Sequence, residues 1–161
     1  MAADPTTAVE GVEAAGGVQL EIPADVGYLS VVRMVVSTLA FSRRDLDDER
    51  VEDLVLAVSE AATNAIEAHA EVPADHPVVV VWREDDDNCR VEVVDRGGRA
   101  DLAALPSEGP PTDPGRAALE GNLGVSLIRA LVDDVNFETD DRGTAVSITM
   151  RCGPLPSPAL D

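Results

Sequence analysis

The sequence predicts an α/β fold, a two-layer sandwich in which a mostly antiparallel sheet carries helices on one face. Three observations support this prediction. Two segments in the first half repeat their apolar residues at helical spacing, and two later pairs of apolar segments are joined by short polar turns, as in β-hairpins. The 161 residues suit one domain, and because aromatic residues make up only 2 %, its core is expected to be aliphatic.

The N-terminal region is expected to hold a tail, a strand and a helix. Residues 1–17 are rich in Ala, Gly, Thr and acidic residues and predict a disordered tail. Residues 18–22 alternate apolar and polar side chains, which indicates an edge strand ended by Pro23. Asp25 is a candidate N-cap for a helix over residues 26–42, whose apolar residues are spaced for one buried face.

A second helix and a hairpin follow. The helix is predicted to begin near Asp47 or Asp48, since acidic residues in a first turn suit the helix dipole, and to end near His69. Residues 78–83 form a near-continuous apolar run, and residues 90–94 return after a turn rich in Asp. This pair of segments predicts two neighbouring antiparallel strands.

The C-terminal part begins with a long irregular segment. Residues 98–120 contain many Gly and Pro residues and break all periodicity, which is typical of a functional lid or of disorder. Residues 123–132 predict a helix, and residues 135–139 and 144–150 predict a second hairpin. Residues 152–161 contain repeated prolines and predict a loose tail.

Charge and composition narrow the functional classes. The formal net charge is −19, and all 12 basic residues are Arg. Without Lys the chain can form neither a Walker-A phosphate loop, nor the strand-lysine site of eukaryotic-type kinases, nor a Schiff base. A chain this acidic repels nucleic-acid phosphates, so a protein partner is expected rather than a polyanion.

Cysteine usage and the N-terminal composition indicate a cytoplasmic protein. Cys89 and Cys152 lack metal-ligand spacing, and two His residues cannot complete a zinc set with them. They are expected to be free, buried thiols in a reducing compartment. No signal peptide and no membrane-spanning segment is predicted.

Several conspicuous side chains are interpreted as structural. Arg43 and Arg44, followed by acidic residues, are typical of a solvated capping region, with a partner surface as the alternative. His69 and His76 are expected to be a helix-end residue and a surface residue. Trp82 is expected to pack within its strand.

The candidate chemistry starts in the middle of the second helix. Over residues 54–66 the only polar side chains belong to Ser59, Glu60, Thr63 and Asn64, in two pairs four residues apart. Such pairs form one polar strip along a helix that is otherwise apolar and therefore mostly buried. Glu60 and Asn64 then supply an anionic base and a neutral oxygen ligand for Mg²⁺, although a solvated stripe is an equal alternative.

Three glycine motifs follow along the chain. Residues 95–98, Asp-Arg-Gly-Gly, come after a strand, where an Asp can point into a cleft, but the pattern is also a common turn. Residues 121–124, Gly-Asn-Leu-Gly, precede a helix, where backbone N–H groups and the dipole favour phosphate, but they can also be a plain helix start. Gly143 and Thr144 lie in the last hairpin and by themselves indicate only a turn and a strand residue.

In this order and spacing, the polar strip and the three glycine motifs resemble the four nucleotide-binding boxes of the GHKL, or Bergerat-fold, ATPases. Within that superfamily the chain resembles the anti-sigma-factor serine kinases of bacteria, the RsbW-like group. The resemblance covers residues 18–151, which are expected to form one histidine kinase-like ATPase domain. It implies the Bergerat ATP-binding fold, with residues 98–120 as the ATP lid.

The resemblance also implies a role for each motif. Glu60 matches the general base that takes the proton of a substrate Ser, and Asn64 matches the residue whose side-chain oxygen holds Mg²⁺ against the triphosphate. Asp95 matches the carboxylate that accepts from the adenine amine, and Thr144 matches a residue beside it. Asn122 stands where the lid motif usually has Gly, which predicts a weakened phosphate contact. The remaining nucleotide-binding positions are Gly97, Gly98, Leu123, Gly124 and Val125.

Taken as a whole, the resemblance implies a partner-switching regulator that works as a homodimer. Such a protein would hold an alternative sigma factor and would use Mg-ATP to phosphorylate a Ser on a STAS-domain anti-anti-sigma protein. The acidic surface suits the basic segments of a sigma factor, with no direct contact to nucleic acid or membrane. Two alternatives stay open: a binding module of the same fold with little or no kinase turnover, and an acidic α/β domain that binds no nucleotide.

Overall fold

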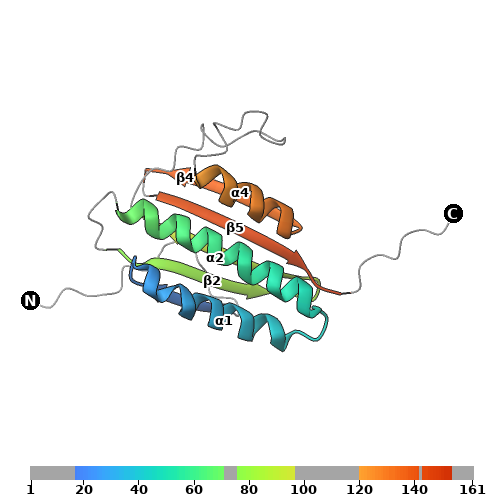
Figure 1. Ribbon diagram of the computed structural model, residues 1–161. Coiled ribbons are helices and arrows are strands. Elements are labelled where there is room, and N and C mark those ends of the chain that lie inside the picture. The colour runs from blue at the N-terminus through green and yellow to red at the C-terminus, as the bar shows by residue number, and fades with distance from the viewer. Residues whose placement is uncertain (1–16, 71–75, 97–119, 142, 154–161) are drawn as a thin grey trace, which may run out of the picture.

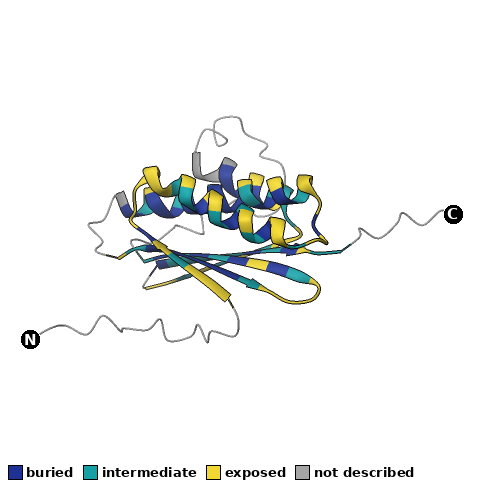
Figure 2. Ribbon diagram, turned by 90° about the horizontal axis from the view of Figure 1, so that it is seen from below, coloured by how far each residue is buried: buried dark blue, intermediate teal, exposed yellow. Residues whose placement is uncertain are grey.

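The computed structural model of the chain describes residues 17–70, 76–96, 120–141 and 143–153. Its elements in chain order are β1 (Gly17–Ile22), the 3-10 turn η1 (Val26–Tyr28), α1 (Leu29–Ser42), α2 (Asp48–Ala70), β2 (Val78–Glu84), β3 (Asn88–Asp95), α4 (Glu120–Leu131), β4 (Asp134–Asp140) and β5 (Gly143–Arg151). The helices lie side by side on one face of a single sheet (Figure 1), so the molecule has two layers (Figure 2). This arrangement confirms the predicted α/β class.

Several predicted segments cannot be compared with the structure. The expected N-terminal tail up to residue 16, the lid over residues 98–119 and the C-terminal tail from residue 154 lie outside the described residues. No helix in the described part of the chain is long and apolar enough to span a bilayer.

The sheet has five strands in the order β1-β2-β3-β5-β4, and its neighbouring strands are antiparallel. Both predicted hairpins are present, as β2–β3 and β4–β5. β3 pairs with β5 although α4 and β4 separate them in the chain. This crossover places Asp95, at the end of β3, opposite Thr144, near the start of β5.

The core lies between the sheet and the helices and is aliphatic, as predicted. Val80 of β2, Val93 of β3 and Val146 of β5 are register partners, so they form one buried row on the helix-facing side of the sheet. Leu54 and Val58 of α2 belong to the same buried cluster and are fully covered. α2 also contacts α1 and α4, and it is therefore the central helix that positions the polar strip.

Side-chain caps begin the helices where the sequence predicts them. The Asp25 carboxylate accepts the Gly27 N–H at 2.7 Å, and this cap starts the 3-10 turn η1 before α1. Asp47, rather than Asp48, caps α2, because its carboxylate accepts the Arg50 N–H at 2.9 Å. Each cap satisfies a backbone donor that has no partner within its helix.

Most element boundaries differ from the predictions by one to three residues, and two of these differences involve glycines. Gly17, assigned to the tail by composition, belongs to β1, where it pairs with Arg83. α4 begins at Glu120, so residues 121–124 lie inside the helix rather than before it. Glycine lowers helix propensity, but the contacts between α4 and α2 compensate for that cost.

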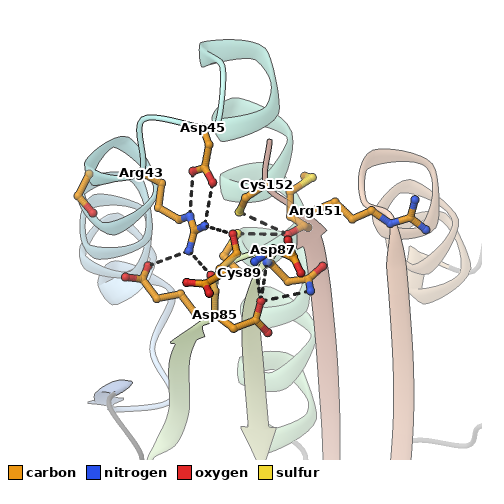
Figure 3. A network of polar contacts seen from close by, with 12 residues as sticks. Arg43, Asp45, Asp85, Asp87, Cys89, Arg151 and Cys152 are labelled. Atoms are coloured by element: carbon orange, nitrogen blue, oxygen red, sulfur yellow. Dashed lines mark hydrogen bonds and ion pairs between the residues drawn. The ribbon is translucent and has the colours of Figure 1, made fainter. Parts of the chain in front are cut away.

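Arg43 ties the loop between α1 and α2 to the β2–β3 turn (Figure 3). Its guanidinium donates to the Asp45 carboxylate over 3.0 and 2.9 Å and to the Asp85 carbonyl oxygen over 2.7 Å. This hydrogen bonding holds the pKa of the Asp45 carboxyl below its ordinary value. The Arg43 side chain is only 12 % exposed, so the predicted solvated capping region is wrong for this residue, whereas Arg44 is exposed.

The two cysteines are free thiols, as predicted, and their side chains meet beside this loop (Figure 3). Cys89 is buried, whereas Cys152 is half-buried rather than buried. Their sulfurs lie 3.6 and 3.8 Å from the Met150 carbonyl oxygen. Burial raises the pKa of Cys89 to about 12 and also raises that of Cys152. Both thiols therefore stay protonated at neutral pH, the form of cysteine that reacts slowly.

Candidate functional site

The residues of the predicted polar strip on α2 contact two neighbouring helices, α1 and α4. Ser59 is buried, and its hydroxyl accepts a hydrogen bond from Arg33 Nη1 of α1 at 3.1 Å. Thr63 donates to the Ser59 carbonyl oxygen at 2.8 Å. Glu60 and Asn64 are half-buried and face α4. The strip is therefore partly enclosed between helices: Ser59 is buried, and Glu60, Thr63 and Asn64 keep only part of their surface exposed, so a fully solvated stripe does not describe it.

Gly124 of α4 lies directly against the Glu60 and Asn64 pair. A Cβ atom added to Gly124 would stand 3.3 Å from Glu60 Oε2 and 3.4 Å from Asn64 Nδ2. The distance to Glu60 Oε2 is tighter than an ordinary van der Waals contact and that to Asn64 Nδ2 is at its lower limit, so a side chain here would require the Glu60 carboxylate to shift by a few tenths of an ångström. Glycine at this position leaves room for a carboxylate and an amide to point toward the beginning of α4.

A second polar group gathers at the end of β3. Asp95 is buried and pairs with Thr144 across the strands. The Thr144 hydroxyl is hydrogen-bonded to that of Thr139, at 3.2 Å. Gly143 has a φ of 148°, and a Cβ atom there would overlap the Asp95 carbonyl oxygen. The last glycine motif therefore packs against the strand end that carries Asp95.

Replacing Gly143 with Ala should destabilise the fold strongly. The substitution combines an unfavourable positive φ with an overlap onto the Asp95 backbone, and together these should cost roughly 3 kcal/mol. Gly153 is a matched control, because its φ is 103° but no atom lies within 4 Å of its added Cβ. Gly153→Ala should cost only about 1 kcal/mol. Chemical denaturation of both variants measures the difference, and equal costs would contradict the close approach at Gly143.

His69 completes this group, at a position that the sequence motifs do not predict. Its Nδ1 lies 2.6 Å from Asp95 Oδ1 and 2.9 Å from the Ala65 carbonyl oxygen, and both side chains of the His69–Asp95 pair are nearly fully buried. The interpretation as an ordinary helix-end residue is therefore incomplete. The available signal was spacing, because His69 follows Ala65 by four residues and so lies on the buried face of α2.

The predicted site residues thus form two groups connected by α2. Glu60, Asn64 and Gly124 form one group, and Asp95 and Thr144 belong to the other. Between Glu60 and His69 the helix advances by roughly 14 Å, a span suited to an extended ligand with different chemistry at each end. Among the other predicted positions, Val125 is buried. Asn122 and Leu123 lie in the first turn of α4, and their side chains are not described. Gly97 and Gly98 lie outside the described residues.

The two groups offer complementary chemistry. The Glu60 carboxylate can accept a proton, and the Asn64 amide oxygen next to it is the kind of neutral ligand that Mg²⁺ takes alongside water and phosphate. The N-terminal turn of α4 beside them favours anions. At the other end, the buried Asp95 carboxylate can accept hydrogen bonds from an amino group. These residues fit a magnesium–nucleotide complex with its phosphates near α4 and its base near Asp95.

Comparison with known proteins identifies the family of the chain. The sequence profile of the histidine kinase-like ATPase domain matches residues 22–150. The serine-protein kinase RsbW of Listeria monocytogenes is 36 % identical over 135 residues, which cover 82 % of this chain and 85 % of that protein. The protein of the same name from Oceanobacillus iheyensis is 34 % identical over 123 residues, or 74 % of this chain and 77 % of that protein.

Solved structures share the fold at lower sequence identity. The crystal structure of the RsbU and RsbW domains of a Mycobacterium tuberculosis protein has a TM-score of 0.61 at 22 % identity, and the match covers 84 % of this chain and 32 % of that chain. The histidine kinase domain of a blue-light-activated histidine kinase from Erythrobacter litoralis has a TM-score of 0.50 at 22 % identity, covering 81 % and 62 %. From the sequence matches and the shared fold, the chain belongs to the histidine kinase-like ATPase family and, within it, to the RsbW serine-protein kinases.

Proposed function

We propose that the protein is an ATP-dependent protein serine kinase and anti-sigma factor, which holds an alternative sigma factor and phosphorylates a Ser on a STAS-domain anti-anti-sigma protein. One observation carries the kinase part of this proposal. Glu60 and Asn64 lie together on α2 against Gly124 of α4, so a carboxylate able to take a proton and an amide able to bind Mg²⁺ lie one turn from a helix N-terminus, which favours phosphate. The similarity to the RsbW kinases supports the partner classes.

In the proposed reaction each group has one task. Glu60 takes the hydroxyl proton of the substrate Ser as its oxygen attacks the terminal phosphorus of ATP, and ADP leaves with the electrons of the broken bond. Asn64 would hold Mg²⁺, which would neutralise charge on the phosphates. The backbone N–H groups in the first turn of α4, those of Asn122 and Leu123 among them, have no acceptor within the helix and would bind phosphate oxygens without any lysine. Asp95, with Thr144 beside it and Gly97 and Gly98 after it, binds the adenine.

The charge of the chain supports the sigma-factor part of the proposal. A formal net charge of −19 repels DNA but attracts the basic segments with which a sigma factor contacts DNA and polymerase. The expected assembly is a homodimer, and the expected setting is the bacterial cytoplasm. Asn122 in the lid motif favours one competing candidate, a sigma-binding module of the same fold with little or no turnover.

A phosphotransfer assay separates these candidates. Purified protein is mixed with Mg-ATP labelled at the terminal phosphate and with the cognate STAS-domain protein, beside a variant of that protein whose candidate Ser is replaced by Ala. Label on the STAS-domain protein that carries the Ser, and not on its Ala variant, supports the kinase. Sigma-factor binding in gel filtration without any labelled Ser would support the binding module instead. If the protein neither transfers phosphate to the Ser protein nor binds the sigma factor, both candidates are contradicted.

A further inference from the structure

His69 and Asp95 form the most completely buried contact between two ionisable side chains of opposite kind among the salt bridges in the described part of the chain. Their side chains are only 2 % and 5 % exposed, and Nδ1 lies 2.6 Å from Oδ1. Nδ1 also faces the Ala65 carbonyl oxygen at 2.9 Å. Since both neighbours are acceptors, Nδ1 carries the hydrogen, and the imidazole donates to the carboxylate.

Such a bond restrains the Asp95 side chain. A hydrogen bond to a carboxylate is shorter and stronger than a neutral one, and burial increases its strength further. On the backbone side, the pairing with Thr144 and the close approach of Gly143 hold Asp95 in place. His69 therefore restrains the rotation of the Asp95 carboxylate, the part of the residue that the sheet does not hold.

We propose that His69 is a positioning residue for base selection: by holding Asp95 through Nδ1, it sets the carboxylate as an acceptor in a fixed direction, so that the site takes a 6-amino purine and rejects a 6-oxo purine. This inference rests on the proposed nucleotide site. A 6-amino group donates to a carboxylate, whereas a 6-oxo group presents a second acceptor to it. Discrimination by hydrogen bonding requires a rigid partner, because a carboxylate that can rotate away from the 6-oxo group loses most of its selectivity.

The contact also links base binding to the opposite end of the site. His69, Glu60 and Asn64 lie on the same helix, α2, so the helix that bears the base and the metal ligand also orients Asp95. The His69 Nε2 atom is buried and has no hydrogen-bond partner among the described residues. The imidazole is thus held through Nδ1, and replacing it removes this one interaction from Asp95.

The test compares ADP with inosine diphosphate, which differs at position 6 of the base. Isothermal titration calorimetry is run on the full chain with wild type, His69→Leu, His69→Asn and His76→Leu. In His69→Leu the affinity for ADP should fall about tenfold, while that for inosine diphosphate changes by less than about twofold. His69→Asn keeps a donor near the place of Nδ1 and should retain most of the discrimination. His76 is exposed, so His76→Leu is the matched control and should behave as wild type.

The possible results are distinct. An unchanged ratio of the two affinities in His69→Leu, or an equal loss for both nucleotides, would overturn the positioning role while leaving the nucleotide site intact. Failure of the wild type to bind ADP would instead contradict the nucleotide site itself. If His69→Leu does not fold, the imidazole NMR signals of the wild type decide. The His69 Nδ1–H signal should shift on adding ADP while the carbon-bound ring protons of the exposed His76 stay, and an unshifted His69 signal would contradict the proposal.

Discussion

Replacing Glu60 with Gln should lower the rate of phosphate transfer to serine by about 100- to 10,000-fold, the range expected for loss of a general base. Gln keeps the size and hydrogen-bonding capacity of Glu, so the packing against Gly124 should survive. The Gln side chain cannot take a proton, so only the rate of phosphate transfer should fall. The affinities for ATP and ADP are expected to stay within about threefold of wild type, because residues other than Glu60 bind the nucleotide in the proposed site.

Glu67 is the matched control for this substitution. It lies on the same helix but is exposed, so Glu67→Gln removes the same charge without touching the site. Initial rates of labelled phosphate transfer are measured for both variants under saturating Mg-ATP. Wild-type rates in Glu60→Gln would place the base elsewhere. An equal loss in both variants would show that total charge, rather than a positioned carboxylate, is responsible.

Replacing Asn64 with Ala should abolish the stabilisation that magnesium and nucleotide give to the fold. Ligand at one hundred times its dissociation constant stabilises a native protein by about 2.7 kcal/mol, which corresponds to several degrees in the melting temperature. The Asn64 amide is half-buried beside Glu60 against Gly124, and in the proposed site it would hold the metal against the phosphates. The Ala variant keeps a good helix former at this position, so the unliganded fold should remain.

Thermal unfolding with and without Mg-ADP checks this prediction. Asn136, exposed on β4, serves as the control, and Asn136→Ala should show the full wild-type shift. EDTA added to the wild type should reduce the shift in the same way as Asn64→Ala does. A full magnesium-dependent shift in Asn64→Ala would remove this residue from the metal site. A missing shift in the wild type would support a chain that binds no nucleotide.

Much of the fold follows from patterns that are local in the chain. Apolar residues at helical spacing predicted α1 and α2, and polar turns between apolar segments predicted the hairpins β2–β3 and β4–β5. The caps at Asp25 and Asp47 follow from hydrogen bonds that span only two or three residues. Patterns of this range depend on neighbouring residues alone, so a single sequence is enough to identify them.

The candidate site was predictable in part, through spacing and resemblance. Glu60 and Asn64 are one helical turn apart, so their shared face follows from helix geometry. Their enclosure could not be derived in the same way, because a polar strip faces either solvent or a neighbouring helix depending on how the helices pack. The structure decides this through Arg33 of α1 and Gly124 of α4, which cover the strip from two sides.

By itself, the sequence determined the α/β class, the hairpins, the helix caps, the acidic character without lysine, and the motifs that identify the family. Only the tertiary structure decided that His69 contacts Asp95, that Arg43 is largely buried and bonded to the β2–β3 turn, and that Gly124 of α4 lies against Glu60. Each of these contacts joins residues from different elements. Their formation depends on sheet order and helix packing, which are set by the burial of the whole core and leave no mark in the spacing of neighbouring residues.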